Sequence, residues 1–427
     1  YFLRKGISVS GYDRVSTPLT SELQNEGINI HFEDNPKLIP VDIDLVVYTP
    51  AIPSELKEFQ FIRKEGTTLQ KRSEVLENIT QDYYTIAVAG THGKTSIASM
   101  ISHILKENRK NVTAFIGGIM SNYDSNFLFS EKCDYMVVEA DEFDRSFLKL
   151  KPSFSVISAM DSDHLDIYLT HEELKNTFQQ FAANTKENGK LLVNSKLKEQ
   201  ISYSGTKILY SVSEDCDYTA LNILPGKHDY IFNIRYAKGR IDNIRLQMPG
   251  KHNVENALAA AAIALNLGIS AKDIKQALES YKGVKRRFEY RIKHGETIFI
   301  DDYAHHPEEI HAFVEAVKNL YPSKKISGIF QPHLYSRTRD FAEEFAKSLS
   351  LLDEIILLDI YPAREKPIEG VSSKIIFDRI GHDNKVLLNK EELLNWIGNK
   401  KFEVLATIGA GDIDQLVEPI EKILMKR

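Results

Sequence analysis

One short segment constrains the fold of this chain more than any other. Residues 89–96 read Ala-Gly-Thr-His-Gly-Lys-Thr-Ser, between an apolar run at residues 84–89 and a stretch at residues 96–107 with its apolar side chains on one helical face. A strand, a glycine-containing loop and a helix in this order form a phosphate-binding unit in parallel α/β proteins. The pattern therefore predicts an α/β fold built on a parallel sheet.

The residue types of this loop suit a polyphosphate ligand. Glycines let backbone amides wrap an anion, the next helix adds its N-terminal dipole, Lys94 can reach the β- and γ-phosphates, and Thr95 can ligate Mg²⁺. Val88 stands where the full Walker pattern has its first glycine, so the match is to a variant of that pattern. An ordinary tight turn is the alternative. The predicted nucleotide-binding residues are Gly90, Thr91, His92, Gly93, Lys94, Thr95 and Ser96.

Length and composition place this loop in a multidomain globular protein. The chain has 427 residues, more than one hydrophobic core usually serves, and its 42% hydrophobic and 27% charged residues exclude wholesale disorder. Alternating strand-like and helical stretches predict three α/β domains in series, at residues 1–82, 83–287 and 288–427. The chain starts without Met on what reads as the end of a helix, so we expect the first domain to be incomplete at its start.

Charge and cysteine content exclude several classes of function. A net charge of −6 does not supply the broad cationic surface of a nucleic-acid-binding protein. Cys133 and Cys216 are far apart and lack the spacing of zinc ligands, which disfavours a zinc site and a disulfide framework. No apolar run reaches the roughly 18 residues of a membrane span. We therefore expect a cytoplasmic protein that binds neither membranes nor nucleic acid.

Strand-like runs recur through all three domains. They lie at residues 7–10, 28–30, 44–48, 84–89, 135–138, 155–158, 297–300, 326–330, 355–359 and 404–408. A hairpin is predicted around Lys238-Gly239, and an alanine-rich helix at residues 253–266. Because open α/β sheets bind ligands beyond the carboxyl ends of their strands, the residues that follow these runs are candidate site residues.

Two such places carry carboxylates that suit a metal ion. Glu139 comes directly after the run at residues 135–138, where phosphate-loop domains commonly hold their metal, whereas most of the acidic segment at residues 139–144 is expected to be a solvated loop. His164 follows the next strand among several aspartates, and either serves a second metal or is an ordinary packed or surface histidine. The predicted metal ligands are Thr95, Glu139 and His164.

Three arginines in the third domain or at its boundary could bind anionic groups of a ligand. Arg287 lies where the second and third domains meet and either stabilises a transferring phosphoryl group or belongs to a solvated linker. Arg337 and Arg339 follow the run at residues 326–330 and could grip a carboxylate in bidentate fashion, with ordinary surface arginines as the alternative.

Several blocks of the sequence, in the same order along the chain, resemble the Mur ligase family. They are Gly90-Thr91-His92-Gly93-Lys94-Thr95, Glu139-Ala140-Asp141-Glu142, Asp163-His164-Leu165-Asp166, Gly250-Lys251-His252-Asn253, Arg286-Arg287-Phe288-Glu289, Asp301-Asp302-Tyr303-Ala304-His305-His306-Pro307, Gln331-Pro332-His333 and Gly409-Ala410-Gly411-Asp412. The resemblance implies a Rossmann-like UDP-binding first domain, a central P-loop ATPase domain and a Rossmann-like third domain.

The resemblance also implies an activity. It is the ATP-dependent joining of L-alanine to the lactyl carboxylate of UDP-N-acetylmuramate through an acyl phosphate, in peptidoglycan precursor synthesis. ATP and Mg²⁺, with Mn²⁺ as a substitute, would be the cofactors, and the protein would be a monomer or a homodimer. A tripeptide ligase of the recycling pathway, a folylpolyglutamate synthetase, and a nucleotide-binding module without ligase activity are the alternatives.

By this resemblance, roles extend to residues beyond the phosphate loop. Lys94, His164, Arg287 and His305 would be catalytic. Asn253, Asn256, Arg287, Asp302 and Tyr303 would lie near the nucleotide, and His305, Arg337 and Arg339 near the amino acid. The family's first glycine-rich loop is absent, which leaves Asp13, Thr49 and Ala51 as candidate contacts to the uridine nucleotide.

Two further departures from the family affect these assignments. Leu334 replaces an arginine of some relatives, so Arg337 and Arg339 would carry more of the contact to the alanine carboxylate. No lysine follows His164 at the spacing of the carbamylated lysine of sister ligases, so none is predicted here.

Overall fold

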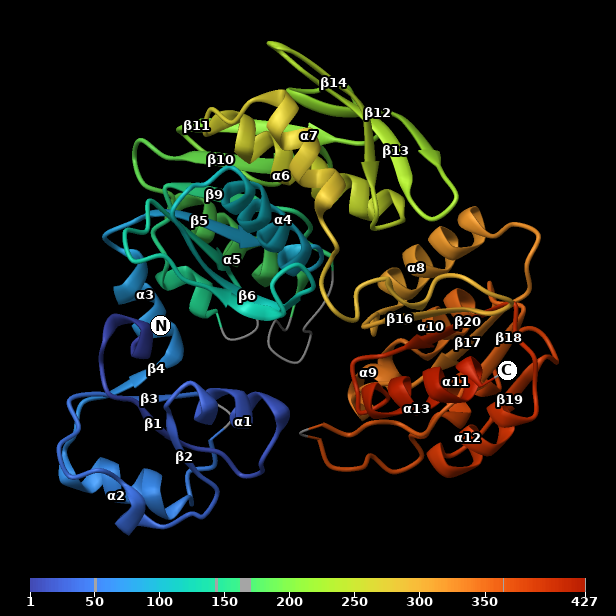
Figure 1. Cartoon of the computed structure of the whole chain (residues 1–427), viewed down its shortest axis with the longest axis horizontal. Helices are drawn as coiled ribbons and strands as arrows, with labels where there is room; N and C mark the ends of the chain where they lie inside the picture. The colour runs from blue at the N-terminus through green and yellow to red at the C-terminus, as the bar shows by residue number, and fades with distance from the viewer. Residues whose placement is uncertain (50–51, 143–144, 162–169, 364, 427) are drawn as a thin grey trace.

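The computed structural model describes residues 1–49, 52–142, 145–161, 170–363 and 365–426. Three α/β units follow one another along the chain, coloured blue, cyan to yellow, and orange to red in Figure 1. Within the described residues, every helix is too short or too polar to cross a lipid bilayer.

The first unit contains two small parallel sheets. Its strands are β1 (Ser10–Tyr12) with β2 (Asn29–His31), and β3 (Val46–Tyr48) with β4 (Leu69–Lys71). Its helices are η1 (Leu3–Lys5), α1 (Pro18–Asn25), η2 (Pro36–Leu38), α2 (Lys57–Glu65) and α3 (Arg72–Thr80). The strand predicted at residues 7–10 starts only at Ser10, because pairing begins where β2 supplies partners.

The central unit is built on a ten-stranded sheet in the order β14-β13-β12-β11-β10-β9-β5-β8-β6-β7. Its strands are β5 (Tyr84–Ala89), β6 (Val112–Met120), β7 (Ser125–Leu128), β8 (Tyr135–Glu139), β9 (Phe154–Ile157), β10 (Lys190–Asn194), β11 (Thr206–Ser211), β12 (Tyr218–Pro225), β13 (Tyr230–Tyr236) and β14 (Gly239–Leu246). Neighbouring strands are parallel in the part of the sheet that runs β12-β11-β10-β9-β5-β8-β6. At the two edges, β7 pairs antiparallel with β6, and β13 and β14 continue antiparallel from β12. The predicted hairpin is confirmed as β13 and β14.

Helices cover both faces of this sheet. They are α4 (Lys94–Glu107), α6 (Lys251–Asn266) and α7 (Ala271–Ser280) on one face, α5 (His171–Ala183) on the other, and the short η3 (Ser146–Lys149) and η4 (Ser195–Leu197). Alternate side chains of β5 point to opposite faces, so Ile86 and Val88 pack with α4 while Ala87 and Ala89 pack with α5. This two-sided burial explains the continuous apolar run of β5.

The third unit has a six-stranded sheet in the order β15-β16-β20-β17-β18-β19, parallel except for the edge strand β15. Its strands are β15 (Glu289–Ile292), β16 (Ile298–Asp302), β17 (Ile326–Phe330), β18 (Glu354–Leu357), β19 (Lys385–Leu387) and β20 (Val404–Ile408). Its helices are α8 (Pro307–Leu320), α9 (Tyr335–Asp340), α10 (Ala342–Leu349), α11 (Lys374–Phe377), α12 (Lys390–Gly398) and α13 (Asp414–Met425). Helices α8 and α10 pack on one face, and α12 and α13 on the other.

Candidate active site

A cavity of about 1030 Å³ lies between the central and third units. Its walls come from the loop after β5, the end of β8, the start of α6, the segment that joins the two units, and the start of α8. These are carboxyl ends of parallel strands and amino ends of helices, the places where open α/β sheets bind anionic ligands.

The loop after β5 approaches its neighbours too closely for side chains at its glycines. Gly90 has a φ of 140°, and a Cβ there would lie 2.1 Å from Ser158 Oγ. Gly93 has a φ of 85°, and a Cβ there would lie 2.6 Å from Asn256 Oδ1. Helix α4 begins at Lys94, two residues before the predicted start, because Ile97 N already donates to Gly93 O. The loop therefore packs closely against Ser158 and Asn256, and its residues 91–96 line the cavity.

Lys94 is held by two acceptors of its own chain. Its Nζ donates to Gly90 O at 2.7 Å and to Glu142 Oε1 at 2.9 Å. Burial by itself would lower the pKa of Lys94, but the carboxylates of Glu142 and Asp141 raise it above its ordinary value. Lys94 is therefore a charged ammonium at the wall of the cavity.

The burial of Glu142 corrects one prediction. The acidic segment after β8 was expected to be mostly a solvated loop, yet the Glu142 side chain is 0% exposed. Its pairing with Lys94 provides the partner that a buried carboxylate requires. The sequence signal that could have revealed it is a second glutamate three residues after Glu139, close enough to return to the phosphate loop.

Thr95 and Glu139 meet beside Lys94. Thr95 Oγ1 donates to Glu139 Oε1 at 2.9 Å, and Gly117 N donates to Glu139 Oε2 at 2.7 Å. A hydroxyl and a carboxylate are hard oxygen donors of the kind that Mg²⁺ prefers, so the pair fits the predicted metal. His164 lies outside the described residues, and the described residues contain no group of three or more metal-binding side chains.

Two asparagines of α6 complete the central wall. Asn253 and Asn256 are buried, and both line the cavity. Asn253 Nδ2 donates to Pro249 O at 2.7 Å, which orients its amide at the start of the helix. The structure therefore brings both predicted nucleotide-binding asparagines to the phosphate loop.

The opposite wall is formed by Arg287 of the joining segment and by Asp302, Tyr303 and His305 of the third unit. Asp302 accepts hydrogen bonds from Phe288 N at 2.7 Å and Ala304 N at 2.8 Å, and burial raises its pKa to about 7. The Arg287 guanidinium lies 5.2 Å from the centre of the Tyr303 ring. Arg286 and Phe288, on either side of Arg287, have φ values of 61° and 47°, so the joining segment turns sharply here.

Three family models cover most of the chain. The Mur ligase family catalytic domain matches residues 1–84, the Mur ligase middle domain residues 88–264, and the Mur ligase glutamate ligase domain residues 286–405. The chain belongs to the Mur ligase family.

Relatives of this Mur ligase match along its whole length. It is 47% identical to the UDP-N-acetylmuramate--L-alanine ligase of Christiangramia forsetii over 431 residues, covering 100% of this chain and 94% of the relative. The enzyme of the same name from Parabacteroides distasonis is 46% identical, with the same coverage. The crystal structure of UDP-N-acetylmuramate-alanine ligase from Thermotoga maritima superposes with a TM-score of 0.81 at 26% identity, covering 100% of this chain and 94% of that one.

Other predicted residues of this Mur ligase lie outside the cavity lining. Asp13 and Thr49 are exposed in the first unit, and Ala51 lies outside the described residues. Arg337 is buried on α9 near His305, where it helps burial to lower the pKa of that histidine to about 4. Arg339 does not join it, because its side chain is 53% exposed and pairs with Asp340. The predicted pair of carboxylate-binding arginines is thus not assembled in this structure.

Sequence reasoning missed Glu309, which lines the cavity from the first turn of α8. Its carboxylate lies 3.4 Å from His92 Nδ1 and 3.7 Å from Arg287 Nη1. The available signal was Pro307, which suits the first position of a helix and so places Glu309 in its first turn, beside the preceding histidines.

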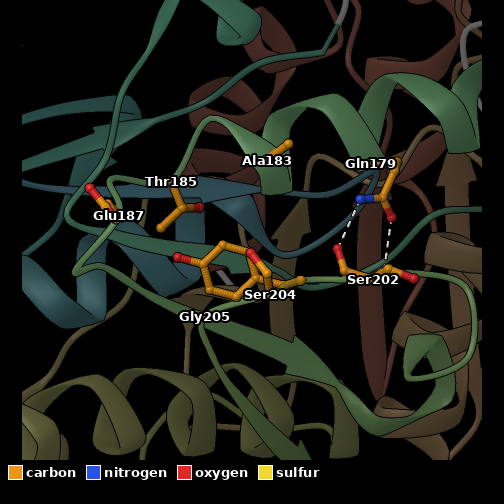
Figure 2. Close-up of a pocket in the computed structure, with 8 residues that line it drawn as sticks. Gln179, Ala183, Thr185, Glu187, Ser202, Ser204 and Gly205 are labelled. Carbon is orange, nitrogen blue, oxygen red and sulfur yellow. Dashed lines mark hydrogen bonds between the residues drawn. The ribbon is translucent and has the colours of Figure 1, made fainter.

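A second cavity, of about 840 Å³, lies in the central unit away from these residues. Figure 2 shows its lining, where the Gln179 amide and the Ser202 backbone exchange two hydrogen bonds of 2.8 Å. The lining is mostly neutral and contains none of the predicted site residues.

Proposed function

We propose that this Mur ligase joins L-alanine to the lactyl carboxylate of UDP-N-acetylmuramate and cleaves ATP to ADP and phosphate in doing so. The observation that carries the proposal is the cavity in which a phosphate loop faces buried polar residues of the third unit. Relatives named for this activity are 43–47% identical over the full chain, which supports the same substrates here.

The reaction has two chemical steps. A carboxylate oxygen attacks the γ-phosphorus of ATP, so that the bond to ADP breaks and an acyl phosphate forms. The neutral amine of alanine then attacks the acyl carbon, phosphate leaves with the bonding electrons, and the nitrogen gives up one proton, which the phosphate can accept. Bringing a carboxylate to about 4 Å from a phosphate oxygen costs roughly 4 kcal/mol per pair of charges at an effective dielectric constant near 20. The Lys94 ammonium offsets this repulsion from the phosphate loop.

Thr95 and Glu139 are the described residues that would hold Mg²⁺, with Mn²⁺ as a substitute, and His164 is proposed with them. The bound ion would neutralise charge on the phosphate oxygens. The hydrogen bond between Thr95 and Glu139 already sets the two oxygen donors side by side. Glu139 is further oriented by Gly117 N.

His305 is suited to accept a hydrogen bond from the amine. Burial lowers its pKa to about 4, so the imidazole is neutral at neutral pH. Its Nδ1 lies 3.0 Å from Tyr303 O, and donation to that carbonyl leaves a lone pair on Nε2. Arg337, close behind His305, would attract the alanine carboxylate.

The same proposal extends to the surroundings of the enzyme. The substrates are small molecules, the location is the cytoplasm, and the protein is a monomer or a homodimer. Free Cys133 and Cys216 agree with a reducing compartment. The first unit, with Asp13, Thr49 and Ala51, would contact the uridine nucleotide.

The test measures phosphate release from Mg-ATP with UDP-N-acetylmuramate, with and without L-alanine. Release that requires both substrates is expected, and Lys94→Ala should abolish it while Lys110→Ala, at an exposed position, should not. Faster release with a tripeptide than with L-alanine would favour a recycling ligase, which has the same fold in the murein peptide ligase of Psychrobacter arcticus (TM-score 0.70, 21% identity). ATP hydrolysis that no amino acid alters would contradict both.

A further inference from the structure

A single carboxylate connects the two walls of the nucleotide cavity. Glu309 Oε1 lies 3.4 Å from His92 Nδ1 in the phosphate loop and 3.7 Å from Arg287 Nη1 in the joining segment. Glu309 Oε2 lies 3.3 Å from His305 Nδ1 and accepts a hydrogen bond of 3.0 Å from His305 N. Groups from the central unit, the joining segment and the third unit thus converge on one side chain.

The Glu309 carboxylate is ionised although it is only 16% exposed. Burial by itself would raise its pKa, but hydrogen bonding with His92 and the positive charge of Arg287 hold that pKa well below its usual range. A negative charge beside a polyphosphate site disfavours binding of the ligand through like-charge repulsion. A carboxylate at this place therefore needs another role, and the groups it contacts indicate what that role is.

His92 is the point at which the third unit reaches the phosphate loop. It lies between the loop glycines, and its Nε2 lies 3.7 Å from Asp161 Oδ2 while its Nδ1 faces Glu309. Glycine-containing loops have many backbone conformations, so a side chain that lies between two carboxylates, at 3.4 and 3.7 Å, restricts them. Such a restraint limits the conformations of residues 90–93 beside the cavity.

We propose that Glu309 is a positioning residue, whose carboxylate ties the phosphate loop through His92 to Arg287 and His305 and so sets how the third unit closes on bound nucleotide. The proposal deepens the proposed ligase function, on which its kinetic consequence rests. The contacts of Glu309 with His92, Arg287 and His305 exist in the protein without substrates, so they are tested separately.

The first experiment is backbone hydrogen–deuterium exchange on the nucleotide-free chain. In Glu309→Gln, peptides that cover residues 90–93 should exchange at least about fivefold faster than in the wild type, because local opening becomes easier when a restraint is lost. Glu315→Gln is the matched control, since Glu315 lies further along α8 with a side chain that is 61% exposed. Faster exchange confined to the start of α8 would indicate a merely local role and overturn the proposal.

The second experiment compares Mg-ATP affinity by calorimetry with kcat for phosphate release. Glu309→Gln should lower kcat at least about tenfold, because misplaced groups lose transition-state contacts, while affinity for Mg-ATP stays equal or rises as a repelling charge is removed. Combining Glu309→Gln with His92→Asn should lower kcat no further than the worse single variant, since both substitutions remove the same contact between Glu309 and His92. A double variant whose fold-loss in kcat equals the product of the two single losses would count against the proposal.

The proposed ligase function and the proposed positioning role of Glu309 can be disproved independently. If phosphate release by the wild type does not depend on L-alanine, the proposed function is wrong, whereas the exchange experiment still tests the role of Glu309. If the wild type is active and loop exchange in Glu309→Gln equals that of the wild type, only the role of Glu309 is wrong.

Discussion

Lys94 Nζ lies 2.9 Å from Oε1 of the fully buried Glu142, and the two residues form an ion pair at the base of the nucleotide cavity. The carboxylate is thus an internal partner of the lysine. The pair therefore links the stability of the central unit to the residue that we propose to contact the nucleotide phosphates.

Removing the lysine should affect both stability and turnover. Burial raises the pKa of Glu142 even beside Lys94, so Lys94→Ala should leave a buried carboxyl that either stays charged without its partner or takes up a proton, which should cost up to about 3–5 kcal/mol in the free energy of unfolding. Turnover should fall by a factor on the order of 10²–10³ or more, because a positioned charge on the phosphates is lost. Urea unfolding and phosphate release measure the two effects.

A second substitution separates these effects. Lys94→Ala combined with Glu142→Gln should recover most of the stability, because a neutral amide replaces the unpaired charge, but should recover none of the turnover. Recovery of turnover would contradict the role of Lys94 at the phosphates. Equal instability of both variants would contradict the importance of the ion pair.

Glu139 should determine the requirement for Mg²⁺. Its carboxylate already bonds Thr95 Oγ1 at 2.9 Å, so Glu139→Gln keeps the shape of the site but weakens an anionic ligand. The Mg²⁺ concentration for half-maximal turnover should rise about 10–100-fold. Turnover is measured at fixed ATP across Mg²⁺ concentrations, with Glu131→Gln, at an exposed position, as the control. An unchanged Mg²⁺ requirement would remove Glu139 from the site.

Asp302 should make stability depend on pH. Burial raises its pKa from 3.8 to about 7 in the folded chain. The stability contributed by the protonated form is therefore fully present below pH 3.8 and is lost as the pH rises through about 7. Asp302→Asn mimics the protonated form, so its stability relative to the wild type should increase between pH 4 and pH 8, by at most about 4 kcal/mol.

Thermal unfolding of both proteins across this range measures the difference. Asp383→Asn, at an exposed carboxyl of the same unit, should show no such trend. A difference between Asp302→Asn and the wild type that stays constant with pH would mean that Asp302 is ionised throughout.

A second contact joins the central and third units away from the nucleotide. His228, in the turn between β12 and β13, lies with its Nδ1 2.8 Å from Tyr321 Oη, and Tyr321 Oη lies 3.0 Å from Tyr290 Oη. His228→Ala removes one partly buried hydrogen bond, worth about 1 kcal/mol, and should shift the population toward more open arrangements of the two units.

Small-angle scattering of the nucleotide-free chain should then give a larger radius of gyration for His228→Ala than for the wild type. His311→Ala, at a side chain of α8 that is 45% exposed, should leave it unchanged. Equal radii for all three proteins would show that this contact does not hold the units together.

Much of the site was predictable because its signals are local. Strands β5, β17 and β20 occupy the predicted residues, since buried strands need continuous apolar runs. Thr95 and Glu139 meet because Thr95 follows β5 and Glu139 ends the neighbouring parallel strand β8, and the carboxyl ends of the two strands share one edge of the sheet. The resemblance to a known family supplied the two asparagines, which no periodicity indicates, and it favoured a nucleotide contact over a solvated linker for Arg287.

The sequence by itself determined the order of elements, the phosphate loop and the edge of the sheet where ligands bind. Only the tertiary structure decided that Glu142 is buried against Lys94, that Glu309 reaches His92, and that Arg339 stays in solvent. The physical reason is the distance along the chain over which each kind of signal acts. Apolar periodicity and glycine placement report what a segment does locally, whereas the pairing of a polar side chain depends on which distant segment packs against it.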